Sequence, residues 1–254
     1  MRWRTLVFGL FAAALALFVA LDPAVAQTFN FDLGERSGSN TARIVQMLAL
    51  LTVLSLAPSI LVMVTSFTRI VVVLSFVRTA LGIQQTPPNS VMISLALFLT
   101  AFVMMPTMQT VYDEALVPLV REDIDEMTAL DRATAPVRDF MLTHVRDQDL
   151  TMFIDMADVG PVENAEDTPM RALVPAFMIS ELRRAFEIGF LIFLPFLVID
   201  MVVASILMSM GMMMLPPVII SLPFKIIFFV LVDGWYLIAG SLVQSFGADG
   251  PIGG

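Results

Sequence analysis

Long stretches without a charged side chain constrain the fold of this chain more than any other feature. The first holds 25 residues between Arg43 and Arg69, and roughly 20 apolar residues are enough for a helix to cross a bilayer. Over all 254 residues, 58% are hydrophobic and 15% are charged, whereas a soluble domain has about half and a quarter. We therefore expect an all-α membrane protein.

Prolines divide the first apolar half of the chain. Pro58 should kink the first stretch, and Pro87-Pro88 breaks the next one, which leaves Asn89 to Tyr112 as a second span. The apolar piece 70–77 is too short to cross a bilayer and is expected to be part of a bent hairpin. Residues 27–112 then form a first proline-broken helical hairpin.

A second proline-broken hairpin is expected in residues 171–246. The apolar run from Phe186 to Met214 passes Asp200, and three prolines separate it from the run Ile226 to Phe246. The two hairpins give four hydrophobic spans in all. Residues 247–254 are expected to be a flexible tail.

The segment between the hairpins, residues 113–170, has a different character. From Asp113 to Asp167 it contains fifteen Asp or Glu and four Arg, a net charge of −11. The spacing of Val137, Phe140 and Met141 favours short amphipathic helices. A solvated acidic segment without a specific role is also consistent with this composition.

The N-terminus, residues 1–26, has the features of a cleavable signal peptide. Two arginines precede an apolar stretch from Leu6 to Ala20, and the small residues Ala24 and Ala26 flank Val25 before the expected cleavage site. An uncleaved first membrane helix is the alternative, but this stretch is shorter than the roughly 20 residues that a span needs. We expect cleavage after Ala26.

The basic residues predict the topology. Arg69 and Arg78 lie in the expected loop of the first hairpin, and Lys225 follows the second, so the positive-inside rule places both hairpin tips toward the cytoplasm. The acidic segment would then lie in the periplasm. Three arginines, Arg171, Arg183 and Arg184, oppose this assignment. Two of them can be offset by acidic residues at helical spacing, Arg184 by Glu181 and Arg183 by Glu187.

Composition excludes several classes of function. The chain has no cysteine and a single histidine, His144, which removes disulfides, thiolate nucleophiles, zinc sites and most acid–base enzymes. Its net charge of −9 argues against a nucleic-acid partner.

Charged residues within the apolar second hairpin are candidate functional sites. Asp200, Lys225 and Asp233 lie in apolar sequence, where an unpaired charge costs roughly 2.5–3.5 kcal/mol. An ion pair that locks helices or subunits together is the simpler interpretation. A proton relay and a transporter site are the alternatives, because broken helices are typical of transporters.

The run Ser209 to Pro217, SMGMMMLPP, places Met212, Met213 and Met214 between a glycine and two prolines. Methionine is flexible and unbranched, so these residues could simply fill gaps between helices. They could also form a deformable seal that closes a pore and moves aside during passage. A Cu(I) site is the least favoured interpretation, because no cysteine is present.

Two long blocks resemble the FliP family of flagellar biosynthetic proteins. The first runs from Pro58 to Thr100 (PSILVMVTSFTRIVVVLSFVRTALGIQQTPPNSVMISLALFLT), and the second from Leu173 to Trp235. The resemblance implies a non-enzymatic subunit of the flagellar type III export gate without a cofactor. In that family several copies assemble with FliQ and FliR into a helical, cone-like channel for unfolded flagellar proteins, and FlhA and FlhB complete the gate. A virulence type III secretion homologue and an ion channel or transporter are the alternatives.

The resemblance also implies roles for residues. Met212, Met213 and Met214 match the family's methionine loop, described as a gasket in the channel, and Gly211, Pro216 and Pro217 release the backbone around it from a continuous helix. In the family's assemblies much of the apolar sequence lies inside the protein cone. The candidates for buried charges, which we expect to pair between neighbouring subunits, are Arg69, Glu181, Asp200, Lys225 and Asp233.

Overall fold

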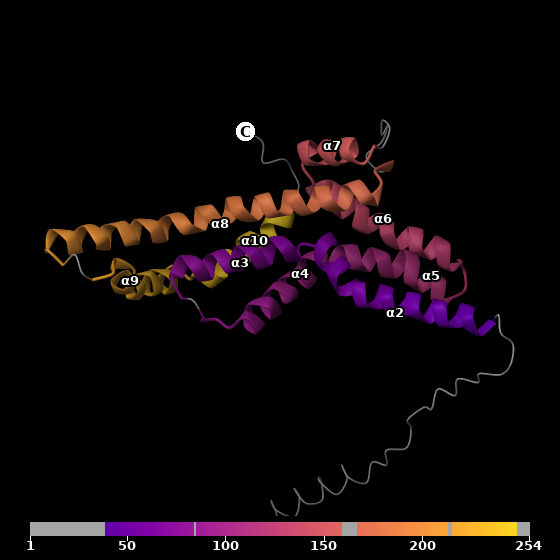
Figure 1. Cartoon of the computed structure of the whole chain (residues 1–254), viewed down its shortest axis with the longest axis horizontal. Coiled ribbons are helices and arrows are strands. Elements are labelled where there is room, and N and C mark those ends of the chain that lie inside the picture. Colours follow the sequence, from indigo (N-terminus) through magenta and orange to yellow (C-terminus); the bar gives the residue numbers. More distant parts are fainter. Residues whose placement is uncertain (1–38, 84, 159–166, 213–214, 248–254) are drawn as a thin grey trace, which may run out of the picture. The chain divides into compact units, whose positions relative to one another are not determined.

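The computed structural model of the chain describes residues 39–83, 85–158, 167–212 and 215–247. Every regular element in these ranges is helical, as the sequence predicts. The expected signal peptide with Ala26, the tail beyond Gly247, and Met213 and Met214 lie outside the described residues. The chain divides into two compact units, residues 1–53 and 54–254, and the second unit contains all helices after α2 (Figure 1).

The first apolar stretch is interrupted before Arg69. Helix α2 (Ser39–Val64) ends where Thr65 and Thr68 donate their hydroxyls to the carbonyls of Leu61 and Val62, which satisfies acceptors that a helix end leaves open. Helix α3 (Phe67–Leu81) then begins, and it ends at a left-handed glycine, Gly82.

The prediction that Arg69 lies in a hairpin loop is therefore wrong. Arg69 lies within α3 and is buried. The short apolar piece 70–77, expected to be part of a bent hairpin, is the buried centre of the same helix. Hydropathy alone could not show that residues 70–77 form a buried helix. A short helix that is surrounded by other helices is as apolar as a short piece of a membrane hairpin.

The second span begins at the predicted residue but continues further. Helix α4 (Asn89–Val111) passes through a π-helical turn, η1 (Tyr112–Leu116), into α5 (Val117–Val120). The run Asn89–Val120 is long and apolar enough to cross a membrane. The first acidic residues of the segment therefore belong to this helical run rather than to a loop.

The rest of the acidic segment forms helices α6 (Glu126–His144) and α7 (Asp147–Met156). At the start of α6 the Thr128 hydroxyl donates to the carboxylate of Asp125, and this hydrogen bond lowers the pKa of that carboxyl. The predicted amphipathic pattern is confirmed, because Met141 is buried and both Val137 and Phe140 pack against its cluster. The same cluster includes Phe177, so the acidic segment is anchored to the helix that follows it.

The second hairpin is built from three helices. Helix α8 (Met170–Ser209) has 40 residues and is a second candidate span, and α9 (Pro217–Leu231) and α10 (Gly234–Gly247) meet at an angle of 62°. If this bent pair counts as one broken span, the described residues contain three candidates, and otherwise two. The expected total of four spans remains a prediction.

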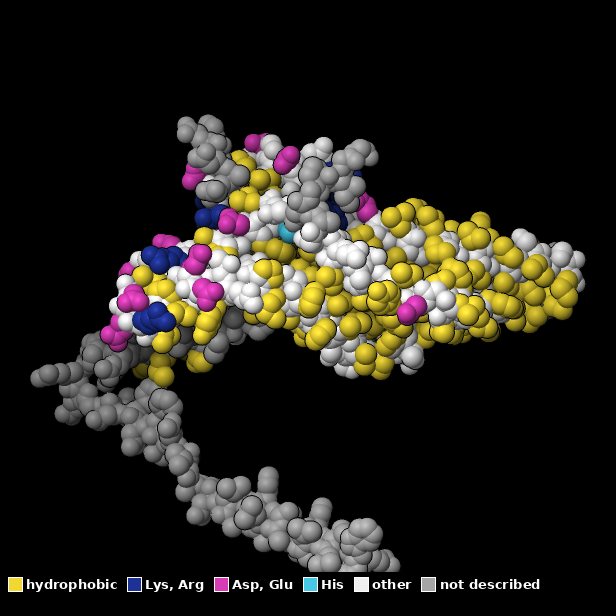
Figure 2. Space-filling view, turned by 180° about the vertical axis from the view of Figure 1, so that it is seen from behind, with side chains coloured by type: hydrophobic (Ala, Val, Ile, Leu, Met, Phe, Trp, Pro, Cys, Tyr) yellow, Lys and Arg dark blue, Asp and Glu magenta, His cyan; other side chains and the backbone are white. Residues whose placement is uncertain are grey.

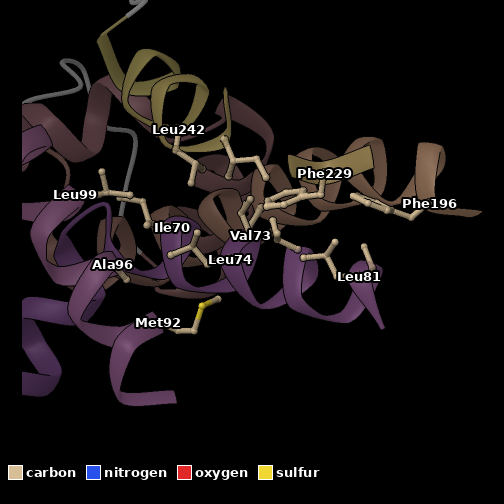
Figure 3. Packing of buried hydrophobic residues seen from close by; sticks show 14 of the residues in the cluster. Ile70, Val73, Leu74, Leu81, Met92, Ala96, Leu99, Phe196, Phe229 and Leu242 are labelled. Carbon is tan, nitrogen blue, oxygen red and sulfur yellow. The ribbon is translucent and has the colours of Figure 1, made fainter. Parts of the chain in front are cut away.

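Helix α3 lies alongside α8 and forms the centre of the main hydrophobic core (Figure 1). Its residues Ile70, Val73, Leu74 and Val77 have the spacing of one helical face. Figure 3 shows labelled side chains of α4, α9 and α10 gathered around the side chains of α3. The main hydrophobic core is therefore arranged around α3.

Helices α3 and α8 approach each other closely at Gly189. A Cβ atom at this glycine would lie only 2.4 Å from a ring carbon of Phe76, so no larger residue fits without a shift. The two helices can therefore also bring their polar side chains into direct contact.

Candidate functional site

A buried ion pair joins α3 to α8. The Nε atom of Arg69 donates to Oε2 of Glu181 at 2.8 Å, and a second, parallel hydrogen bond joins the same two side chains. The side chains are 1% and 0% exposed. Such a two-bond geometry is specific to arginine, because its planar guanidinium matches a carboxylate.

Arg69 also contacts α10. Its Nη1 atom donates to Oγ of Ser245 at 3.1 Å and to the Ser245 carbonyl at 3.3 Å, and its guanidinium lies 3.7 Å from the centre of the Phe246 ring. We call these four residues, Arg69, Glu181, Ser245 and Phe246, the clamp. The clamp holds α3, α8 and α10 together at one point, and its charges are surrounded by partners rather than left in apolar packing.

A second ion pair joins α8 to α9. Nζ of Lys225 lies 2.6 Å from Oδ2 of Asp200, and the Ser221 hydroxyl donates to the other carboxylate oxygen at 2.5 Å. Lys225 also donates to the carbonyl of Ala80 near the end of α3 at 3.2 Å. We call Asp200, Ser221 and Lys225 the brace. The Lys225 side chain is 4% exposed and that of Asp200 is 24% exposed, so solvent reaches the brace from the Asp200 side.

Asp233, another candidate buried charge in the second hairpin, is exposed in the single chain. It lies at the bend between α9 and α10 with a left-handed φ of 51°, and it is exposed. Its side chain makes no hydrogen bond or ion pair with any other part of the chain that the structure describes. Burial of Asp233 by a neighbouring subunit, as the resemblance implied, stays a prediction.

The segment between α8 and α9, residues 210–216, is the hairpin tip. Gly211 has a φ of 75°, and the N–H groups of Gly211 and Met212 donate to the carbonyls of Met208 and Leu207. This is a Schellman motif, which ends a helix by satisfying its last carbonyls and needs a residue that tolerates a left-handed backbone. At the other side Pro216 precedes α9, and Pro217 is its first residue.

Methionines are exposed at the described part of this tip. Met208, Met210 and Met212 are all exposed, and they follow the last buried residue of α8, Leu207. The tip is therefore bounded by capping hydrogen bonds at its start and by prolines at its end.

The structure assigns partners that the sequence left open. Glu181 pairs with Arg69 and not with Arg184, whereas Arg183 and Glu187 form the expected surface pair at 2.9 Å. Both buried pairs lie within one chain, although the resemblance implied pairs between subunits. Sequence reasoning missed Ser221 and Ser245. Ser221 could have been found, because it lies four residues before Lys225 on one helical face.

The arrangement can hold helices, but it offers no group for bond-making chemistry. Within the described ranges, no three His, Asp or Glu side chains are grouped so that they could hold a metal ion. The carboxylates of Glu181 and Asp200 each accept hydrogen bonds from a cation and lie on opposite sides of Gly189 in α8. Their chemistry is that of ion pairs between helices.

Comparison with known proteins identifies relatives of this chain by sequence. The sequence profile of the FliP family matches residues 50–242. The flagellar biosynthetic protein FliP of Caulobacter vibrioides is 58% identical over 241 residues, which cover 94% of this chain and 90% of that protein. FliP of Bacillus subtilis is 58% identical over 207 residues (82% and 94%), and FliP of Aquifex aeolicus is 52% identical over 204 residues (80% and 85%). The profile match spans well over half of the chain, and the matched region contains both ion pairs and the hairpin tip: this chain belongs to the FliP family.

Proposed function

We propose that this chain is a core subunit of the flagellar type III export gate, which passes unfolded flagellar proteins across the inner membrane. Several copies assemble with FliQ and FliR family proteins into a helical, cone-like channel, and FlhA and FlhB family proteins complete the gate. The chain needs no cofactor and is not an enzyme. The observation that carries the proposal is a methionine-rich hairpin tip on a rigidly held pair of helices in a FliP family chain.

The surface of the molecule supports an assembly in the membrane. Figure 2 shows that hydrophobic side chains cover the end formed by α8 and α9, while charged side chains gather over the helices of the acidic segment. The exposed apolar residues of α8 alone include Phe186, Phe190, Leu191, Val198, Met201, Val202 and Ile206. Soluble monomers rarely expose so large an apolar surface, so lipid or other subunits must cover it.

The hairpin tip is suited to sealing a channel. A seal must pack against itself when closed and accept different side chains when open, and methionine repacks at little cost because it has three rotatable bonds and no branch. Met212, Met213 and Met214 are the residues that we assign to this seal. Gly211, Pro216 and Pro217 fix the ends of the tip, and the brace holds the two helices beneath it.

We place the acidic segment, residues 113–170, in the periplasm. Arg78, in the last turn of α3, is the basic residue that remains next to the first hairpin loop, since Arg69 is buried, and an exported N-terminus after cleavage at Ala26 agrees with this orientation. The four spans of the two hairpins, 27–112 and 171–246, belong to the same proposal.

Deleting the gene tests the function. We expect loss of flagella and of secreted hook and filament proteins, and restoration of both by the full-length chain. An ion channel or transporter predicts disturbed ion homeostasis with flagella still present, and a virulence secretion subunit predicts loss of secreted effectors with normal motility. Either result would contradict the proposal.

A further inference from the structure

Four charged side chains lie in the apolar helices α3, α4, α9 and α10 and in the bend between the last two. They are Arg69, Arg78, Lys225 and Asp233. Two of them are neutralised by α8, because Glu181 pairs with Arg69 and Asp200 pairs with Lys225. Arg78 and Asp233 remain, and their charges are opposite.

Arg78 has a polar partner but no acidic one. It lies in the last turn of α3, it is half-buried, and its guanidinium donates to the amide oxygen of Asn89 at the start of α4. An amide satisfies a donor without neutralising its charge. In the part of the chain that the structure describes, Arg78 forms no ion pair.

Asp233 lies in strongly apolar surroundings. The exposed side chains beside it in sequence are all apolar or aromatic: Val230, Leu231, Val232, Trp235, Tyr236 and Leu237. The bend that carries Asp233 lies in the middle of a helix pair that together is apolar enough to form a broken membrane span. A lone carboxylate in such a position is costly unless a cation meets it.

A second copy of the chain carries a cation of the kind that Asp233 needs. On these helices each copy has one positive and one negative side chain without an oppositely charged partner, and the two do not pair with each other within the described chain. A head-to-tail interface joins two different surface patches of identical chains. If Arg78 lies in one patch and Asp233 in the other, the same contact neutralises both side chains in every copy except the two terminal ones. We propose that Asp233 of one copy forms an ion pair with Arg78 of the neighbouring copy. This contact rests on the proposed assembly of several copies in one channel.

Cross-linking tests this contact directly, because the chain has no native cysteine. The full chain carrying Arg78→Cys and Asp233→Cys is produced with its partner proteins and treated in membranes with a short bifunctional thiol reagent. Such a reagent is preferred to oxidation, because an arginine–aspartate pair holds its Cβ atoms further apart than the roughly 4 Å of a disulfide. We expect a ladder of covalent multiples of this chain.

Three controls belong to the cross-linking experiment. Each single variant should give no ladder, and Arg78→Cys combined with Val120→Cys should give none either, because Val120 is exposed outside these helices. Two differently tagged copies of the unaltered chain should co-purify. If they do not, the proposed assembly itself is wrong. If they do and no ladder forms, or if the Asp233→Cys variant cross-links to a different polypeptide, the contact with a second copy is refuted.

A charge exchange gives a second, independent readout. Asp233→Arg alone and Arg78→Asp alone should each lower the yield of oligomer by about tenfold or more, since each leaves two like charges facing each other. The combined exchange should restore most of that yield. A double variant that assembles no better than the worse single variant, while remaining in the membrane at normal amounts, would overturn the pairing.

Discussion

The clamp and the brace are both ion pairs to α8, yet their surroundings differ. At the clamp both charges are buried and Arg69 has contacts from two further residues of α10, whereas the brace leaves the carboxylate of Asp200 partly exposed beneath the hairpin tip. The comparison indicates a division of roles along α8. The part of α8 at the clamp is packed in the protein interior. The part at the brace is held to α9 and leads to the flexible methionine side chains of the hairpin tip.

The largest effect is expected from breaking the clamp on one side. Arg69→Met should reduce the stability of the folded chain by about 3–5 kcal/mol, because it leaves the Glu181 carboxylate buried without a cation. The measurement is the loss of helical signal on heating the detergent-purified chain.

The double variant Arg69→Met with Glu181→Met sharpens this prediction. Replacing both partners by apolar residues of similar volume removes the unpaired charge, so much of the lost stability should return. If the double variant is as unstable as the single one, the clamp matters through its contacts with Ser245 and Phe246 rather than through charge.

A smaller effect is expected at the brace. Lys225→Ala should cost roughly 2–3 kcal/mol, because Asp200 keeps its hydrogen bond from Ser221 and reaches solvent. Arg183→Ala is the matched control, since its pair with Glu187 is exposed and surface pairs contribute about 0–1 kcal/mol. Thermal unfolding of both variants in detergent checks the order, and equal losses would contradict the assignment of Lys225 as a buried partner.

Packing gives the next comparison. Gly189→Ala should destabilise by about 1–3 kcal/mol, because the new Cβ would collide with Phe76 between α3 and α8. Gly240→Ala in α10 meets no atom within 4 Å and should stabilise its helix by roughly 0.5–1 kcal/mol. Opposite shifts in the midpoint of thermal unfolding are the expected result. Shifts of the same sign would show that helix propensity outweighs the close approach.

Much of the fold could be predicted from the sequence. Uncharged stretches and prolines predicted the first residue of α4 and placed the end of α8 near the hairpin tip. They could do so because membrane-spanning helices are recognised by their apolar composition and are broken by proline. The short buried helix α3 was not predicted, because its apolar length is that of a core helix and not of a span. Arg69 therefore looked like a loop charge.

The site was predictable by residue type but not by pairing. Charges in apolar sequence had to have partners, which singled out Asp200, Lys225 and Asp233, and the structure pairs the first two with each other. The partner of Glu181 lies 112 residues away in sequence, and only tertiary packing brings Arg69 to it. The local alternative, Arg184, had the right spacing on α8. Helical spacing predicts neighbours on one helix and carries no information about a second helix.

The last comparison concerns the hairpin tip, where the effect on stability should be smallest. Replacing Met212, Met213 and Met214 together by Ala should leave assembly intact, because the capping bonds of Gly211 and the brace do not depend on these side chains. The closed gate should instead leak ions and small solutes. Each truncation removes apolar volume that alanine cannot refill.

Side-chain volume and side-chain flexibility can be separated at the same three positions. Replacement by Leu keeps a similar volume and should keep much of the seal, whereas replacement by Glu should hydrate the constriction and leak more than Leu. The assay is solute passage across the inner membrane of cells that express each variant, with the amount of assembled complex measured in parallel. If the methionines only fill gaps between helices, triple Ala should lower the yield of complex, and the leak should follow that loss. A triple Ala variant that assembles normally and stays as tight as the unaltered chain would refute the seal, because the tip would then close nothing.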